Sequence, residues 1–272
     1  MNILDKIIAS KYREVEERKV LYPVSELQKS KFFKNKPLSL KKEILRAGSL
    51  GIIAEFKRCS PSAGIINETS LVWKVCAEYI EAGSSAVSVL TDTEFFGGST
   101  NDLTDVRLKI NQPVLRKDFI IDEYQIIEAR ANGADAILLI AELHRAERLE
   151  QLHNFARSIG LEVLMEIHDD KNISCIPPDA EIIGINSRNL GTFSVNLEHL
   201  NRIIQLLPDK TVKVAESGIR SVNDYLDLRN AGFDAFLIGE FFMRTANPGL
   251  TCRKFIDEIR TSPLNHLYRS KE

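Results

Sequence analysis

The sequence is poor in the residues that metal sites and disulfide frameworks require. Its 272 residues include four widely separated cysteines and five histidines, no two of which are three or four residues apart. Zinc sites need closely spaced Cys or His ligands, and small secreted domains need a higher density of cysteine. We therefore expect no metal ion and a reducing, cytoplasmic location. The cysteines are Cys59, Cys76, Cys175 and Cys252.

The chain also lacks an excess of charge of one sign and a long apolar run. Its 36 lysines and arginines nearly balance 38 aspartates and glutamates, for a formal net charge of −2. This balance predicts no general affinity for nucleic acid or membranes, and it favours a monomer. No run approaches the roughly 18 apolar residues of a membrane helix, and Asp5 and Lys6 interrupt the apolar pattern where a signal peptide would have its core. An anionic ligand would have to be bound by local geometry.

Short apolar runs rich in Ile, Val and Leu recur between residues 51 and 239, separated by polar residues and by segments of helical periodicity. This order is typical of βαβ units with parallel strands. Eight such runs predict an α/β fold, a single (β/α)8 TIM barrel over residues 49–262. The predicted strands are Ile52 to Lys57, Ala86 to Thr91, Pro113 to Asp118, Asp135 to Ala141, Glu162 to Ile167, Glu181 to Asn186, Thr211 to Glu216 and Ala235 to Gly239.

Residues 1–48 are expected to form a helical extension of the same domain, and residues 263–272 a C-terminal tail. The extension begins with apolar residues spaced as in an amphipathic helix, which ends before Pro23. So short a segment cannot bury a core of its own. We therefore expect the helix to lie over one opening of the barrel. Its apolar residues are Ile3, Ile7, Ile8 and Tyr12.

Polar residues gather at the C-terminal ends of the predicted strands, where barrel enzymes build their active sites. Because side chains alternate along a strand, Glu55 and Lys57 point into the barrel and Ala54 and Phe56 point toward the helices. A solvated strand end or a salt bridge would explain any one of these residues, but not five strands that converge on one polar cluster. A desolvated lysine near other cations is expected to lose basicity and a crowded glutamate to gain it, which suits acid–base catalysis. The inward-facing residues on the other four strands are Lys117, Glu166, Asn186, Arg188 and Glu216.

Two glycine-containing segments near the last strands indicate a phosphate site. Ser217-Gly218 follows the seventh predicted strand, and Gly239-Glu240 follows the eighth. Glycine lets backbone N–H groups approach an anion, and barrels often bind phosphate with these two loops, although Ser-Gly pairs are also ordinary turn residues. Ser60, after the first strand, is a candidate hydroxyl donor, with a plain proline turn as the alternative.

Apolar loop residues near the same strand ends suit an aromatic substrate ring, although such residues more often serve only in packing. They are Phe95, Phe96, Phe119 and Leu190.

At these residues, and over nearly the whole chain, the sequence resembles the indole-3-glycerol phosphate synthases. Ser187 stands where this family often has Asn, and Phe56 where a smaller aliphatic residue is common. The motifs that carry the resemblance are residues 53–62 (IAEFKRCSPS), 88–92 (SVLTD), 95–99 (FFGGS), 114–120 (VLRKDFI), 166–168 (EIH), 184–190 (GINSRNL), 216–219 (ESGI) and 238–240 (IGE).

The resemblance implies the substrate 1-(o-carboxyphenylamino)-1-deoxyribulose 5-phosphate, which is cyclised, decarboxylated and dehydrated without a cofactor. It implies that Lys117 is the general acid for ring closure and that Glu166 transfers a proton during dehydration. It implies that Lys57 holds the substrate carboxylate and is the acid for hydroxyl loss. Glu55 and Asn186 are implied to orient hydroxyls, and Arg188, Glu216 and Ser217 to complete the polar shell. The implied phosphate ligands are Ser60, Gly218, Gly239 and Glu240, and the implied aromatic pocket is Pro61, Phe96, Phe119, Leu138 and Leu190.

Two other functions remain open from the residues alone. A Schiff-base aldolase could use Lys57 or Lys117 as its amine nucleophile. A catalytically silent barrel could serve as a binding subunit, although the full set of charged strand ends argues against it. We expect a small phosphorylated substrate, no nucleic-acid or membrane partner, and at most transient contact with neighbouring pathway enzymes.

Overall fold

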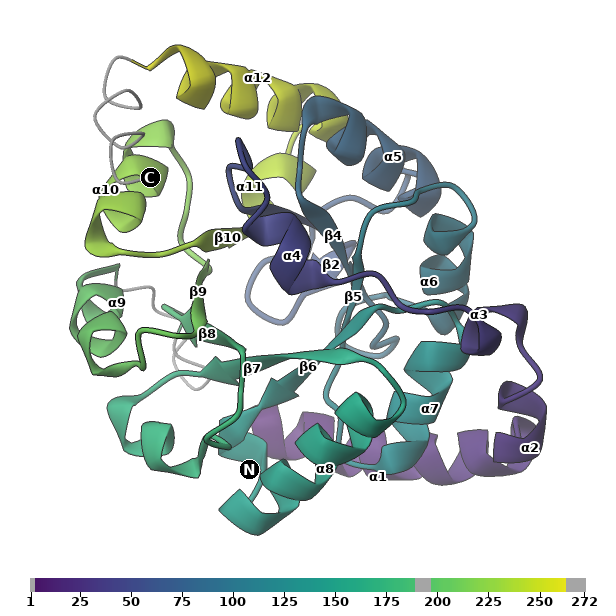
Figure 1. Ribbon diagram of the computed structural model, residues 1–272. Coiled ribbons are helices and arrows are strands. Elements are labelled where there is room, and N and C mark those ends of the chain that lie inside the picture. Colours follow the sequence, from purple (N-terminus) through teal and green to yellow (C-terminus); the bar gives the residue numbers. More distant parts are fainter. Residues whose placement is uncertain (1–2, 189–196, 263–272) are drawn as a thin grey trace.

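Eight parallel strands close into a barrel in the computed structural model, which describes residues 3–188 and 197–262 (Figure 1). Each strand pairs with the next one along the chain, and the last pairs with the first. The predicted TIM barrel is confirmed, with each predicted strand end within one residue of the observed one. The strands are β1 (Ile52–Phe56), β4 (Ala86–Leu90), β5 (Val114–Lys117), β6 (Ala136–Ile140), β7 (Glu162–Ile167), β8 (Ile182–Asn186), β9 (Val212–Glu216) and β10 (Ala235–Ile238).

Helices surround the barrel, and a short hairpin of β2 (Cys59–Ser60) and β3 (Gly64–Ile65) lies in the loop after β1. After β7 a short 3-10 segment, η2, takes the place of an α-helix. The helical segments that follow β1 are α5 (Val72–Ala82), α6 (Thr100–Arg107), α7 (Glu123–Ala131), η1 (Ala141–Leu143), α8 (Ala146–Ser158), η2 (Asp170–Cys175), α9 (Leu197–Ile203), η3 (Ile204–Leu206), α10 (Val222–Ala231), α11 (Glu240–Met243) and α12 (Pro248–Thr261).

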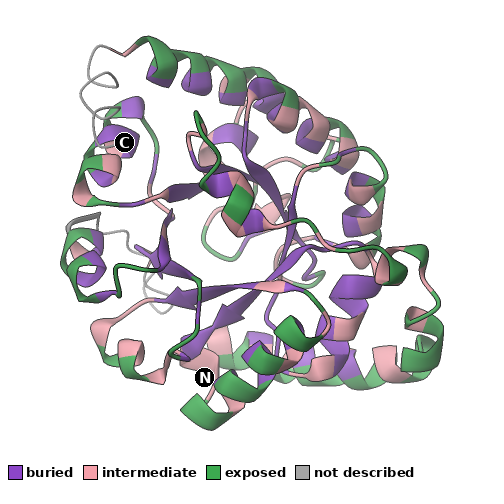
Figure 2. Ribbon diagram, viewed as in Figure 1, coloured by how far each residue is buried: buried purple, intermediate pink, exposed green. Residues whose placement is uncertain are grey.

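The alternation of side chains along the strands divides the apolar core into two parts. Ala54 and Phe56 of β1 pack outward with helix residues, whereas Ile53 packs inside the barrel with Leu115 and Leu164. Figure 2 shows the strands buried along their length and the outer faces of the helices exposed. Because outward and inward positions alternate, the inward set continues directly into the polar residues at the strand ends.

The loop after β5 is held by the start of α7. Asp122 caps this helix, and Gln125 completes a capping box with it. Gln125 also accepts a hydrogen bond from Ile121 N and donates one to the Phe119 carbonyl. The short loop that carries Phe119 is therefore fixed on the rigid end of a helix.

The N-terminal extension contains four helices and covers both openings of the barrel. Leu40 and Ile44 of the last one pack into the inner core against the first residues of the strands, and this helix lies in front of the strands in Figure 1. Ile3, Leu4 and Ile7 of the first one line the cavity at the opposite opening. The helices are α1 (Ile3–Leu21), α2 (Val24–Leu27), α3 (Lys31–Lys34) and α4 (Leu40–Ile44).

The buried face of α1 differs from the predicted one. Tyr12 is 61 % exposed, so its place on the apolar face was predicted wrongly. Lys11 is buried instead, because Ile7, Lys11 and Val15 are spaced four residues apart and share one face of the helix. Sequence pattern missed Lys11 because a lysine is counted as polar even where its ammonium has buried partners.

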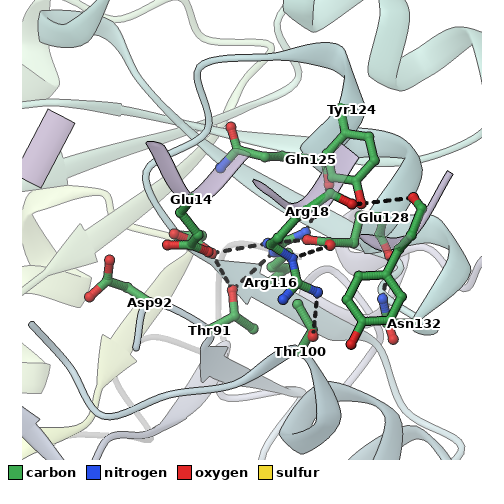
Figure 3. Close-up of polar contacts among 12 residues, drawn as sticks. Glu14, Arg18, Thr91, Asp92, Thr100, Arg116, Tyr124, Gln125, Glu128 and Asn132 are labelled. Carbon is green, nitrogen blue, oxygen red and sulfur yellow. Dashed lines mark hydrogen bonds and ion pairs between the residues drawn. The ribbon is translucent and has the colours of Figure 1, made fainter. Parts of the chain in front are cut away.

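Lys11 belongs to a buried network of charges between α1, β5 and α7. Its Nζ lies 3.0 Å from Asp92 and 2.9 Å from Asp118, and the negative charges of these partners outweigh burial and raise the pKa of Lys11. Arg116 lies 3.0 Å from Asp118 and 2.8 Å from Glu128. Figure 3 shows Arg116 at the centre of this network. Because side chains alternate along a strand, Arg116 points outward from β5 whereas Lys117 points inward.

Replacement of Lys11 by methionine is expected to lower the free energy of unfolding by about 3–5 kcal/mol. Methionine keeps most of the apolar volume but leaves the carboxylates of Asp92 and Asp118 without their shared cation. Urea denaturation measures the change, and Lys6→Met, at an exposed position of the same helix, is the matched control, expected within about 0.5 kcal/mol of the unchanged protein. Equal stability of the two variants would show that the ion pairs of Lys11 contribute nothing to stability.

No helix in the described ranges is long and apolar enough to cross a bilayer.

Candidate active site

A cavity of about 570 Å³ opens at the C-terminal ends of the strands. The structure brings nearly all the predicted site residues to it, although Glu216 and Phe95 are not among the residues that line it and Leu190 falls outside the described residues. Residues that follow the strands of the barrel thus meet at one cavity, as their positions in the sequence predict. The predicted residues that line the cavity are Glu55, Lys57, Ser60, Pro61, Phe96, Lys117, Phe119, Leu138, Glu166, Asn186, Arg188, Ser217, Gly218, Gly239 and Glu240.

Lys117 projects from β5 into a cage of carboxylates. Its Nζ lies 3.0 Å from Glu216 Oε2 and 3.2 Å from Glu55 Oε2. Burial alone would lower the pKa of Lys117, but the negative charges of Glu55, Glu216 and Glu166 outweigh burial and raise this pKa. The expected loss of basicity was therefore wrong, because the neighbours of this lysine are anions rather than cations.

Glu55 joins the two lysines of the site. Lys57 Nζ lies 2.9 Å from Glu55 Oε1, on the side opposite Lys117. Burial would raise the pKa of Glu55, but Lys117 and Lys57 outweigh it and lower this pKa to about 2. The expected gain of basicity is thus wrong for Glu55, which remains a carboxylate at neutral pH.

The pKa values of Glu166 and Glu216 shift upward, opposite to that of Glu55, and the two groups hold one proton between them. Burial raises the pKa of both groups, and it raises the pKa of Glu216 to about 8 despite the opposing charge of Lys117. The two carboxyl groups lie close to each other, and Glu166 Oε2 and Glu216 Oε1 are buried without a hydrogen-bond partner among the described residues. Two adjacent buried carboxyl groups cannot both ionise at low cost, so one proton is shared at neutral pH.

Two glycines leave the space that these carboxylates occupy. A Cβ atom on Gly184 of β8 would overlap Glu216 Oε1, and one on Gly239 would collide with the carboxyl group of Glu55. Gly239 was predicted as a phosphate ligand on account of its backbone N–H. Its close contact with Glu55 is an additional requirement that sequence alone did not indicate.

One end of the cavity is rich in cations and in exposed backbone. Ser217 and Gly218 both have positive φ angles, 67° and 80°, and such a turn makes backbone N–H groups available to an anion. Arg220 and Arg244 also line this end. The prediction missed both arginines, since neither lies at a strand end, and their only signal was proximity to residues 217–219 and to Glu240.

Glu240 and Arg188 form an ion pair across this part of the rim. Arg188 lies 2.9 Å from Glu240 and also donates to Ser62 Oγ at 2.6 Å, while Arg244 lies 2.8 Å from Glu240. The side chain of Glu240, predicted near a phosphate, thus contacts two arginines. It fixes the positions of these cations.

The other side of the cavity is apolar. The rings of Phe96 and Phe119 lie with their centroids 5.9 Å apart. Leu138 continues this wall, and Ile3 and Ile7 of α1 close it. The sequence did not predict that residues of α1 line this cavity, because a helical pattern shows which face is apolar but not what that face contacts.

Within the described ranges, no group of three or more His, Cys, Asp and Glu side chains is placed to hold a metal ion. The cavity therefore offers buried carboxylates, ammonium groups, an anion-binding end and an apolar wall. This combination can transfer protons to and from a phosphorylated substrate that carries an aromatic ring.

Comparisons with known proteins agree with this chemistry. The family model described as "Indole-3-glycerol phosphate synthase" matches residues 4–255. A protein of that name from Bacteroides thetaiotaomicron is 44 % identical over 260 residues, which cover 95 % of this chain and 99 % of the relative. A second one, from Thermoanaerobacter pseudethanolicus, is 41 % identical over 259 residues, covering 95 % and 98 %.

Solved structures of low sequence identity share the fold. The 3-hexulose-6-phosphate synthase of Salmonella typhimurium has a TM-score of 0.59 at 12 % identity, covering 80 % of this chain and 99 % of its own. The thiamine phosphate pyrophosphorylase of Pyrococcus furiosus has a TM-score of 0.57 at 15 % identity, covering 81 % and 99 %. At these identities the likeness supports the barrel architecture alone.

Proposed function

The chain belongs to the indole-3-glycerol phosphate synthase family, and from this premise we propose how its residues carry out the reaction. The protein is a carboxy-lyase of tryptophan biosynthesis. Its reaction cyclises, decarboxylates and dehydrates 1-(o-carboxyphenylamino)-1-deoxyribulose 5-phosphate to indole-3-glycerol phosphate. The proposal concerns the residues that perform each step.

Lys117 is the general acid of ring closure. As the aromatic carbon bearing the carboxylate bonds to the ketone carbon, negative charge develops on the ketone oxygen, and Lys117 Nζ stabilises this oxygen and protonates it. The observation that carries the proposal is the carboxylate cage, in which Glu55 and Glu216 keep Lys117 charged and directed at the cavity. A charged ammonium is the form that an acid must have before the reaction.

Lys57 holds the substrate carboxylate until the ring has closed. Its partner Glu55 keeps the ammonium in place at 2.9 Å. After closure the ring nitrogen carries positive charge, the bond to the carboxylate breaks with loss of carbon dioxide, and the electron pair restores the aromatic ring. Lys57 is then free to protonate the leaving hydroxyl.

Glu166 removes the proton that dehydration requires. Its raised pKa makes Glu166 a stronger base than an ordinary carboxylate. Glu166 can accept a proton from the substrate while Glu216 holds the proton that the pair shares. Asn186 and Glu55 orient the hydroxyl groups. Arg188 and Ser217 complete the polar shell.

The remaining contacts bind the two ends of the substrate. Ser60, Gly218, Gly239 and the segment at Glu240 bind phosphate, supported by Arg220 and Arg244. The aromatic ring lies in the apolar pocket. This pocket consists of Pro61, Phe96, Phe119, Leu138 and Leu190, of which Leu190 is outside the described residues.

The aldolase alternative is disfavoured by the state of the lysines. A Schiff base needs a neutral amine, and both Lys57 and Lys117 are ion-paired with buried carboxylates. Lys117 in addition has a raised pKa.

The purified protein is expected to convert the substrate to a fluorescent indole product and carbon dioxide in equal amounts. Fluorescence and trapped carbon dioxide measure the two yields, and prior treatment with substrate and borohydride is expected to leave the activity intact. Folded protein that gives no indole would contradict the proposal, and loss of activity with borohydride would favour the aldolase.

We also propose a cytoplasmic monomer with at most transient contact with neighbouring pathway enzymes. The biosynthetic reaction of the family supports the location, and light scattering at micromolar concentration tests the oligomeric state.

A further inference from the structure

His168 lies between two carboxylates, one of which is Glu166. Its Nε2 is 3.3 Å from Glu166 Oε1, and its Nδ1 is 3.1 Å from Glu142 Oε2. The side chain is only 10 % exposed, and neither ring nitrogen makes a well-aligned hydrogen bond to any of the described residues. No step proposed above uses this imidazole, although it touches the base of the dehydration step.

Glu142 is firmly held as the outer partner of the ring. It accepts a hydrogen bond from the His168 backbone N–H at 2.7 Å and another from the Asn172 amide. Burial would raise the pKa of Glu142, but its contacts with His168 and Asn172 outweigh burial and lower this pKa. Glu142 is therefore a fixed negative charge on the side of His168 that faces away from the cavity.

The arrangement accommodates one mobile proton. A neutral imidazole can donate to one carboxylate only, whereas an imidazolium can donate to both. These three groups can hold one proton in two ways: on the imidazole between two carboxylates, or on Glu166 beside a neutral imidazole. These forms differ by the transfer of one proton between Nε2 and Oε1.

We propose that His168 is a positioning residue that orients Glu166 and relays its proton toward Glu142. This proposal rests on the role proposed above for Glu166 in dehydration. When Glu166 takes a proton from the substrate, it passes that proton to Nε2, and the charge of Glu142 stabilises the imidazolium that forms. The imidazolium then loses its Nδ1 proton to water beside Glu142, whose side chain is 18 % exposed, which leaves the Nε2–H tautomer. Exchange of the ring proton with water restores the tautomer with Nε2 free, and with it the starting state.

The pH dependence of this group has several contributors. Lys117 faces Glu166 from β5, Glu216 faces it from β9, and Glu142 faces His168 from η1. His199 of α9 contacts the His168 backbone carbonyl at 2.7 Å through its Nε2. A ring nitrogen 3.3 Å from Glu166 that takes up its proton returns Glu166 to the carboxylate form, so removal of this nitrogen shifts protonation of Glu166 to higher pH.

Replacement of His168 by glutamine is expected to lower kcat about 10- to 100-fold with KM changed less than about twofold. The acidic limb of the kcat profile is expected to move up by about 1 pH unit. Glu142→Gln keeps the shape of its side chain and is expected to shift the limb in the same direction by a smaller amount. Steady-state kinetics between pH 5 and 9 measure these values. His153→Gln on α8 is the matched control for His168→Gln, and Glu150→Gln, at an exposed position, is the control for Glu142→Gln.

An acidic limb that stays in place in both variants overturns the relay, whether or not kcat falls, because a purely structural role would lower activity without moving the limb. If His168→Gln does not fold, Glu142→Gln decides alone. Glu166→Gln, measured in the same series, separates the two proposals. Wild-type turnover in Glu166→Gln overturns the role of Glu166 and the relay with it, whereas loss of activity there together with an unmoved limb in the other two variants overturns the relay only.

Discussion

Replacement of Lys117 by alanine is expected to lower kcat by a factor on the order of 10³ to 10⁴ while binding of indole-3-glycerol phosphate changes less than about threefold. The ammonium group is the proposed acid of the first chemical step, and no other cation of the described site contacts both Glu55 and Glu216. The phosphate end and the apolar wall are formed by other loops and do not depend on it. Catalysis and product binding are thus expected to separate.

Lys213→Ala is the matched control for this change. Lys213 lies on β9 between Val212 and Val214, which pack inside the barrel, so its side chain points outward. Its removal is expected to leave kcat within about twofold of the wild type. Because Lys117→Ala also leaves Glu55 and Glu216 without their cation, circular dichroism and product binding must show that the variant is folded. Turnover within tenfold of the wild type in folded Lys117→Ala would refute the acid role.

Replacement of Glu166 by glutamine is expected to lower kcat about 10²- to 10³-fold with little change in KM. Glutamine has the same shape and can still hydrogen-bond to Glu216 and Asn186, but it cannot accept the proton that leaves during dehydration. Ring closure and decarboxylation use other groups and should continue. The variant is therefore expected to stall at the last step, a behaviour that distinguishes it from Lys117→Ala.

Steady-state kinetics measure this change, and Glu150→Gln on the exposed surface of α8 is the control, expected at wild-type activity. A rise in KM with kcat unchanged would mean that Glu166 only binds the substrate.

The convergence of the candidate site residues follows from sequence because it depends on a local rule. Side chains alternate with a period of two along each strand, so Glu55 and Lys57 could be placed inside the barrel from their positions alone. The end of each strand was equally clear, since the apolar runs stop where the polar residues begin. The barrel then brings together residues such as Lys117 and Glu216 that are far apart in the chain.

The protonation states could not be predicted in the same way. The pKa of Lys117 depends on how many anions surround it, and those anions come from β1, β7 and β9. The same holds for Glu55 and Glu216, whose pKa values move in opposite directions although both are buried strand-end glutamates. Only the three-dimensional arrangement decides which glutamate faces the lysines and which faces another carboxyl group.

Contacts between distant segments also could not be predicted from the sequence. Lys11 is buried because Asp92 and Asp118 meet it from other elements, and no pattern within α1 indicates this. Arg220 enters the cavity from just before the start of α10 and Arg244 from the end of α11, rather than from strand ends. His168 was visible in the sequence as part of the segment 166–168, but its position between Glu142 and Glu166 depends on the fold.

The most direct test of the proposed roles counts carbon dioxide and indole product from one turnover of enzyme in excess over substrate. The wild type is expected to give both in equal amounts and at one rate. Lys117→Ala is expected to give neither, because the ring does not close, whereas Glu166→Gln is expected to release carbon dioxide well before indole appears. Carbon dioxide from Lys117→Ala, or equal and simultaneous loss of both products in Glu166→Gln, would contradict the assignment of Lys117 to ring closure and Glu166 to dehydration.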